Sequence, residues 1–196
     1  MAGRRIDSFE DVHPLSREEW RDWLAVNHDK AHGCWFVYYK KHTGKPRVEY
    51  DAAVEEALCF GWIDSLARGL DDERSKLLMT PRKPKSVWSK PNKVRVERII
   101  KAGIITPVGQ AKIDQAKADG SWHALDSSDN LEMPEDLEKA FARNKKAFEK
   151  WSGFAPSARK AILFWLGTAK RENTRASRVE KIVSMAAEGK RANFDK

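Results

Sequence analysis

The sequence has few cysteines and histidines, and their spacing is not that of a common metal site. Two cysteines and five histidines occur in 196 residues, without a CxxC pair or an HExxH motif. Cys34 and Cys59 lie in the apolar stretches HGCWFVYY and EEALCFGW, which predicts two buried free thiols and no disulfide. We therefore expect neither a metal nor another cofactor.

Long hydrophobic runs are also missing. The most apolar stretch, AILFWLGTA at 161–169, is about half as long as the roughly 20 residues that a membrane-spanning helix needs. The first residues, MAGRRIDSFEDVHPL, do not combine a basic leader with an apolar run. The sequence as given predicts a cytoplasmic protein without a transmembrane segment.

The sequence also lacks common catalytic motifs. There is no nucleophile elbow and no glycine-rich phosphate loop. This favours a non-enzymatic protein. The alternative, a small hydrolase or transferase, requires Asp64 or a histidine in a deep cleft with a perturbed environment.

The composition is that of a folded, basic protein. Hydrophobic residues make up 41%, charged residues 34%, and there are eight tryptophans, which argues against disorder. The net charge of +8 is uneven: Lys and Arg outnumber Asp and Glu by 8 to 1 in 82–104 and by 14 to 5 in 141–196. These two basic blocks favour either a solvated surface or a phosphate-bearing partner such as nucleic acid.

The first half of the chain predicts helices alternating with strands. Ser16 and Glu19 form a capping-box pattern at the start of a helix over 16–32. Runs rich in β-branched and aromatic residues predict a central strand at 34–41 and a hairpin formed by 62–67 and 75–80.

Between these strands, 52–60 predicts a helix capped by Asp51, with Glu55 and Glu56 pointing outward. The prolines in 81–92 predict an irregular surface connection.

Further helices follow that connection. Ser89 is the expected cap of the first, whose buried stripe would consist of Val94, Ile99 and Ile100. Thr106 is the expected cap of a helix that runs to about Gly120.

Composition places a linker at 124–130, between an α+β domain at 1–123 and a helical segment at 131–196. In the helical segment, Trp151 and Trp165 are expected in the core. The predicted fold class is α+β with a small sheet.

Five stretches together resemble the YdeI/OmpD-associated family, also called the bacteriocin-protection family. They are EALCFGWIDS at 56–65, PRKPKSVWSKPN at 81–92, KAGIITPVGQ at 101–110, AKADGSW at 116–122, and FAPSARKAILFWLGTAKRENTRASRVEKI at 154–182. The resemblance implies a YdhG-like N-terminal domain and a C-terminal helical segment of the OmdA type. On activity it implies a role in bacteriocin or antimicrobial-peptide resistance, or in stress, without a defined reaction.

Within these stretches, the residues that match the family pattern and have side chains suited to ligand binding are Trp62, Asp64, Arg82, Ser86, Trp88 and Asn92. We expect Arg82 to hold a carboxylate or phosphate group, with Trp62 or Trp88 as a stacking wall.

A structural role is the alternative for each of these residues. Asp64 and Arg82 would then form a buried ion pair, and Trp88 would pack back on the sheet. Ser86, Ser89 and Asn92 would cap helices or form turns around the prolines.

A second candidate anion site consists of Lys170, Arg171, Arg175 and Arg178, around a predicted helix start. The alternative is that Asn173 or Thr174 caps that helix and the basic side chains face water. The resulting hypothesis is a non-enzymatic protein that binds an anionic or peptide ligand. The alternative partner is nucleic acid, and the oligomeric state is not predicted.

Overall fold

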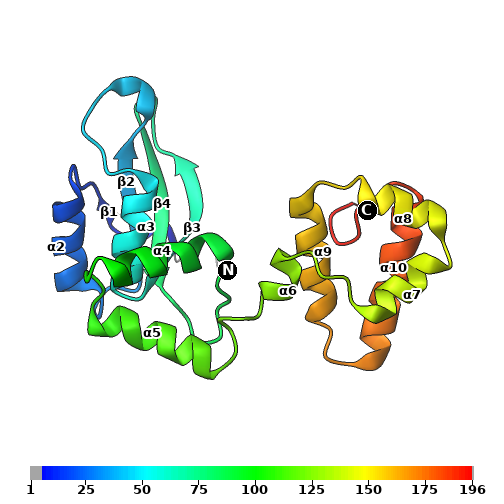
Figure 1. Cartoon of the computed structure of the whole chain (residues 1–196). Helices are drawn as coiled ribbons and strands as arrows, with labels where there is room; N and C mark the ends of the chain where they lie inside the picture. The colour runs from blue at the N-terminus through cyan, green and yellow to red at the C-terminus, as the bar shows by residue number, and fades with distance from the viewer. Residues whose placement is uncertain (1–5, 196) are drawn as a thin grey trace. The chain divides into compact units, whose positions relative to one another are not determined.

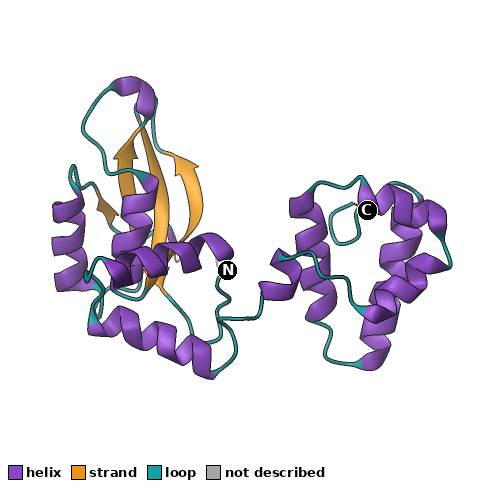
Figure 2. Ribbon diagram, viewed as in Figure 1, coloured by secondary structure: helices purple, strands orange, loops and turns teal. Residues whose placement is uncertain are grey.

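The computed structural model describes residues 6–195 and divides the chain into two compact units, Met1–Trp122 and His123–Lys196. The first unit combines helices with a sheet, whereas the second is helical (Figures 1 and 2). The predicted α+β class is confirmed.

A four-stranded sheet forms the centre of the first unit. Its strands are β1 (Asp11–Val12), β2 (Cys34–Tyr39), β3 (Trp62–Gly69) and β4 (Arg74–Pro81), in the order β1-β2-β4-β3. The short β1 pairs parallel with β2, and the other pairs are antiparallel. The predicted central strand and hairpin are therefore confirmed.

The helices of this unit are α2 (Arg17–Asn27), α3 (Tyr50–Cys59), α4 (Lys90–Lys101) and α5 (Pro107–Ala118), with a 3-10 turn, η1, at Lys41–Thr43. The α-helices lie on one side of the sheet (Figure 2). Trp20 and Leu24 of α2 pack with Phe36 and Met79 of the sheet in the core between the two layers. The oxygen atoms of Ser16 and Thr106 accept the capping hydrogen bonds of α2 and α5, as predicted.

Two predictions about α3 from the sequence were wrong. Glu49, not Asp51, occupies the cap position, and the Asp51 carboxylate pairs with Arg95 at 2.5 Å. Glu55 and Glu56 do not point outward: both are buried, because basic side chains from α2 and α4 reach them. The periodicity of the sequence does not reveal these partners, and it therefore predicted that both carboxylates face the solvent.

The predicted stripe of α4 also needs correction. Val96 and Ile99, three residues apart on one side of the helix, are buried, whereas Val94 and Ile100 are exposed. Ser89 occupies the cap position but makes no side-chain capping bond.

The start of α5 lies directly against the end of α3. The Thr106 hydroxyl donates to the Cys59 carbonyl oxygen at 2.5 Å, in addition to its capping role. A Cβ atom on Gly109 would lie 2.2 Å from that same oxygen. The two backbones therefore approach so closely that only glycine fits at this position.

The opposite side of the sheet is covered by charged side chains. Trp35 is 1% exposed, and the cationic groups of Arg68 and Lys76 lie 5.1 and 4.8 Å from its ring. Asp7 and Asp11 hold these two cations in ion pairs of 2.8 and 3.1 Å. The aliphatic stems thus shield the indole from water.

The second unit contains α6 (Asp126–Asp129), α7 (Glu135–Ala142), α8 (Lys145–Ser152), α9 (Pro156–Gly167) and α10 (Glu172–Ala187). The segment predicted as a linker, 124–130, includes α6, which contacts α9 within this unit. Leu137, Trp151, Ile162 and Ile182 are among the buried residues of its core.

Both cysteines are free and buried, as predicted. Within residues 6–195, no helix combines the length and the hydropathy that crossing a membrane requires.

Candidate functional site

The structure brings Arg82 and Trp88 together but buries both. The Arg82 guanidinium carbon lies 3.6 Å from the centre of the Trp88 ring, and Nη2 donates to the Val87 carbonyl at 2.8 Å. Arg82 is 4% exposed and Trp88 is 2% exposed. Their adjoining cavity has a volume of about 10 Å³, which is far below the roughly 300–1,000 Å³ of ordinary small-molecule sites.

Trp62 and Asp64 are engaged elsewhere. Trp62 is 1% exposed, and its indole nitrogen donates to the carbonyl of His28 at 3.0 Å. Asp64 is half-buried and accepts a hydrogen bond of 2.8 Å from the Tyr50 hydroxyl. Asp64 thus forms a hydrogen bond with Tyr50 and not the ion pair with Arg82 that was the structural alternative.

Ser86 and Asn92 make local contacts. The backbone N–H of Ser86 donates to the Lys83 carbonyl at 3.2 Å, within the irregular connection. The Asn92 side-chain oxygen accepts from Arg95 at 2.8 Å, on α4. Ser86 lines the cavity of about 10 Å³ beside Arg82, which is too small for an organic ligand.

In the second unit, the four basic residues of the other candidate site are divided. Arg175 forms a two-bond ion pair with Asp136, at 2.5 and 3.0 Å. Arg178 stacks on the half-buried Trp165 and lines a hollow of about 450 Å³, whereas Lys170 and Arg171 are exposed and lie outside that hollow.

Two expectations for this unit were therefore wrong. Trp165 is only half-buried: it packs against the edge of the core, and the Arg178 guanidinium lies 4.6 Å from the centre of its ring. Arg171 occupies the cap position of α10, so neither Asn173 nor Thr174 caps this helix.

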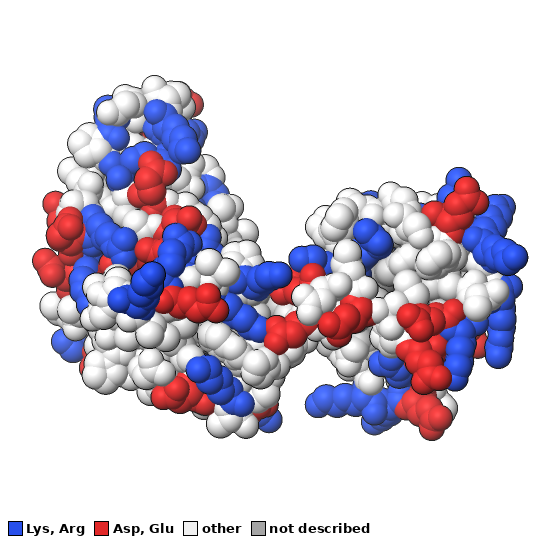
Figure 3. Space-filling model, viewed as in Figure 1, with Lys and Arg blue, Asp and Glu red and all other residues white. Residues whose placement is uncertain are grey.

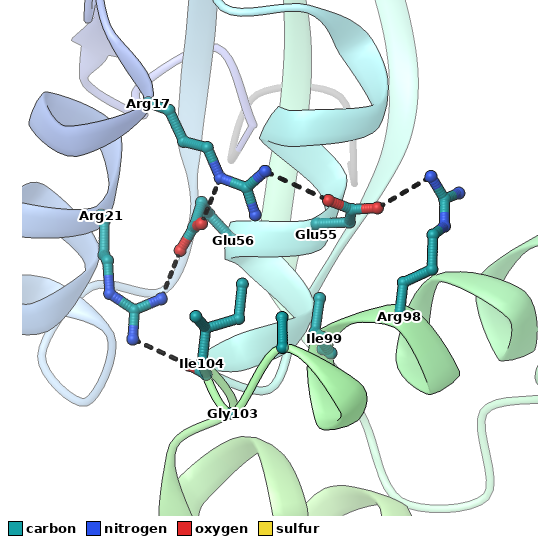
Figure 4. A pocket seen from close by; sticks show the side chains of 9 residues that line it. Arg17, Arg21, Glu55, Glu56, Arg98, Ile99, Gly103 and Ile104 are labelled. Atoms are coloured by element: carbon teal, nitrogen blue, oxygen red, sulfur yellow. Dashed lines mark hydrogen bonds and ion pairs between the residues drawn. The ribbon is translucent and has the colours of Figure 1, made fainter.

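A larger pocket lies in the first unit among α2, α3, α4 and the turn that follows α4 (Figure 4). Its volume is about 570 Å³, within the range of small-molecule sites. The charged residues that line it are Arg17, Arg21, Glu55, Glu56 and Arg98. We call it the arginine pocket.

These five side chains form one row of alternating charge. Glu56 bridges the two arginines of α2, with oxygen–nitrogen distances of 2.6 Å to Arg17 and 2.6 Å to Arg21. Glu55 bridges Arg17 at 3.3 Å and Arg98 at 3.2 Å. The row therefore ties three helices together and ends in a cation at both sides.

Burial within the row is unequal. The side chains of Glu56 and Glu55 are 2% and 10% exposed, whereas Arg17, Arg21 and Arg98 are 36%, 34% and 53% exposed. The carboxylates lie behind the guanidinium groups. A molecule that enters the pocket meets a mainly cationic surface.

The proximity of Glu56 favours the protonated form of Arg17 and Arg21. Burial alone would lower the pKa of Arg17 and of Arg21, but the hydrogen bonds to Glu56 and its charge outweigh that effect and raise both. With three cations against two carboxylates, the lining has one net positive charge.

One nitrogen of the row lacks a partner. Arg17 Nη2 is buried and makes no hydrogen bond with any residue of the described chain. Buried donors are nearly always satisfied in folded proteins. This N–H group therefore has no acceptor within the described chain, and Glu55 joins its side chain to that of Arg98.

Apolar and backbone groups complete the pocket. Ile99, Ala102 and Ile104 line it, and Arg21 Nη2 donates to the Ile104 carbonyl at 2.8 Å. That bond fixes the Arg21 guanidinium between Glu56 and the turn, as Figure 4 shows. The pocket is suited to bind an acidic group attached to an apolar body.

The reactive groups near the pocket are few. The thiol of Cys59 lies close to Arg21, and burial, together with the charge of Glu56, raises its pKa to about 11. A thiol of this kind is a poor nucleophile at neutral pH. In the described part of the chain, no group of three or more His, Cys, Asp or Glu could hold a metal ion.

Sequence reasoning missed this pocket, although two signals were present. Arg17 and Arg21 are four residues apart, which places both on one side of a helix. Glu55 and Glu56 interrupt the otherwise apolar run AAVEEALCF. A helix that is apolar on all sides is buried, and carboxylates within it then require cationic partners.

Comparison with known proteins gives a match for each unit. Residues 12–112 match a family described as a domain of unknown function, DUF8412, and the YdhG-like relationship expected for this region stays a prediction. Residues 130–189 match the OmdA family, described as "Bacteriocin-protection, YdeI or OmpD-Associated". No curated protein and no solved structure matches the chain. The chain thus belongs to the DUF8412 family, whose match spans more than half of its length, and its residues 130–189 carry a domain that matches the OmdA family.

Proposed function

We propose that this protein is a non-enzymatic resistance or stress protein that binds a small acidic ligand in the arginine pocket. The proposal combines the OmdA match with the geometry of the first unit. The observation that carries it is the buried Arg17 Nη2, a donor without a partner in the described chain, within a pocket of net positive charge.

The chemistry of the lining defines the class of ligand. One net positive charge favours a single carboxylate or phosphate group, because a second anionic group would lie close to Glu55 without a further cation. The apolar side chains of Ile99, Ala102 and Ile104 favour a ligand with an aliphatic or aromatic part. A short peptide that ends in a carboxylate belongs to this class.

Nucleic acid fits the charged surface less well. Of the basic block 82–104, Arg82 is buried, and Arg95 and Arg98 are paired with acidic residues of α3. On the face shown in Figure 3, basic and acidic side chains are interspersed over the first unit. A surface that follows a phosphate backbone would instead present cations without acidic neighbours.

Calorimetric titration of the full-length chain tests the binding. Butyrate and butyl phosphate represent the two acidic groups, and butylamine is the cationic control. We expect both anions to bind, butylamine not to bind, and affinity to fall as salt rises.

Arg98→Gln is the informative variant, because this side chain is 53% exposed and lies at the end of the row. It should weaken butyrate binding by about tenfold, the effect of losing roughly 1.4 kcal/mol from a charged hydrogen bond. Lys101→Gln, which removes a charge from the same helix outside the pocket, should leave binding unchanged. Equal binding by wild type and Arg98→Gln would refute the site.

Protection is tested separately in cells. Bacteria that express wild type or Lys101→Gln should survive a bacteriocin or antimicrobial peptide better than cells that express Arg98→Gln at the same protein level. If all three protect equally while only Arg98→Gln fails to bind butyrate, the pocket does not serve resistance.

A further inference from the structure

A second, much smaller cavity lies between the connection after β4 and the end of α5. Its volume of about 10 Å³ leaves room for one species the size of a water molecule or a halide ion. It shares no lining residue with the arginine pocket.

Arg82 brings a buried charge to this cavity. The residue is 4% exposed, and it makes no ion pair with any residue between 6 and 195. Its polar contacts are the carbonyl oxygens of Ser86 and Val87, at 3.5 and 2.8 Å. Burial lowers the pKa of Arg82 to about 10, and the charge of Asp64 offsets this only in part. The guanidinium is still cationic at neutral pH, and a buried cation without a counter-charge is costly.

Ser121 supplies a donor from the other side of the cavity. The residue is 7% exposed, and its hydroxyl makes no hydrogen bond of normal geometry with the rest of the described structure. The exposed Asp119 lies beside it: the interaction with the Ser121 side chain is the main reason why the pKa of Asp119 is lowered, and the carboxylate also accepts the Ser121 backbone N–H at 2.9 Å. The hydroxyl therefore lies near the Asp119 carboxylate without forming a hydrogen bond of normal geometry with it.

The lining as a whole attracts anions. Besides Arg82, it includes Lys83, Lys85 and Lys112, against the single carboxylate of Asp119. Lys85 has a φ of 61°, a left-handed conformation that costs a non-glycine residue roughly 1 kcal/mol or more. This conformation belongs to the turn that closes the connection over the cavity.

We propose that this cavity binds one monatomic anion of the chloride class, held by Arg82 and Ser121. The ion neutralises a guanidinium that makes no ion pair within the described chain, and it links the connection after β4 to the turn that follows α5. A water molecule would fill the same space but would leave the charge uncompensated.

Crystals of the full-length protein grown in sodium bromide locate the ion directly. Bromide scatters anomalously, so we expect an anomalous peak inside the cavity, within hydrogen-bonding distance of Ser121 Oγ and the Arg82 guanidinium. Density in the cavity without an anomalous signal identifies water and overturns the proposal.

Calorimetric unfolding tests whether the ion binds at moderate concentration. Sodium gluconate is replaced stepwise by sodium chloride at constant ionic strength. The Tm of wild type should rise by about 2–4 °C and then level off, as expected for one site that binds only the folded state.

Variants distinguish chloride binding in this cavity from general effects of salt on Tm. Ser121→Ala should lose at least half of the rise in Tm, whereas Ser65→Ala, which removes a hydroxyl elsewhere in the same unit, should keep it. Arg98→Gln should also keep it, since the arginine pocket lies apart from this cavity. A rise that does not level off, or one that is equal in wild type and Ser121→Ala, overturns the proposal even if bromide is seen in the crystals.

Discussion

Glu56 of α3 links this helix to α2 through two ion pairs. Its carboxylate is almost wholly removed from water and accepts from Arg17 and Arg21, both at 2.6 Å. Replacing it by glutamine keeps the shape but leaves two guanidinium groups without their ion pair. We expect Glu56→Gln to lower the free energy of unfolding by about 1–3 kcal/mol, measured by urea denaturation.

The matched control is Glu97→Gln, at an exposed position of α4. It should change the free energy of unfolding by less than about 0.5 kcal/mol. If both variants lose the same stability, Glu56 does not act through its buried ion pairs.

Tyr50 makes the stability of the first unit sensitive to high pH. Partial burial and the hydrogen bond to Asp64 raise the pKa of its hydroxyl to about 12. In the unfolded chain the hydroxyl ionises near 10, so its contribution is fully present below pH 10 and is lost as the pH rises towards 12. Between these values, wild type should lose more stability than Tyr50→Phe, as measured by chemical denaturation. Parallel stability curves would contradict this assignment.

At the scale of elements, the contact between α3 and α5 is the most restrictive. A methyl group on Gly109 would meet the Cys59 carbonyl at 2.2 Å, and this atom belongs to the backbone and cannot turn aside. Gly109→Ala should therefore destabilise the first unit by about 1–3 kcal/mol, as a lowered Tm in calorimetry.

Gly167 in α9 is the control for helical glycine, since nothing lies within 4 Å of the Cβ it would gain. Gly167→Ala should leave stability unchanged or raise it by up to about 1 kcal/mol. If Gly109→Ala left the Tm unchanged, α3 and α5 could move apart without a loss of stability, and the prediction would be wrong.

Elements that depend on local chemistry were predictable from the sequence. Ser16 and Thr106 cap the helices they were expected to cap, since a cap involves only neighbouring residues. Glu55 and Glu56 were misplaced, because periodicity contains no information about cations on other helices. The contact between Arg82 and a tryptophan was anticipated, but its burial depends on how the connection folds back.

At the scale of the whole molecule, the two units have separate hydrophobic cores. Ile162 is fully buried in the second core, and its replacement by alanine should cost that unit about 2–5 kcal/mol. Hydrogen exchange of the full-length chain should show faster exchange in 123–195, with the core amides of the first unit unaffected. Equal acceleration in both units would mean that they unfold as one.

The sequence could predict the architecture of the molecule better than its chemistry. Segment order and the OmdA resemblance pointed to the family whose model matches residues 130–189. The arginine pocket draws on three helices that are far apart in the chain. Only folding brings its charges together, so the local signals at 17–21 and 55–56 do not reveal that they belong to one site.

The covering over Trp35 has a consequence for how the molecules behave in concentrated solution. Two long cationic side chains, each tethered to an aspartate, take the place that a second layer of helices has in many folds. Replacing Arg68 and Lys76 by short side chains would expose the flat ring of Trp35 on the surface of the sheet. Neighbouring molecules would then adhere to one another through it, although each would remain correctly folded.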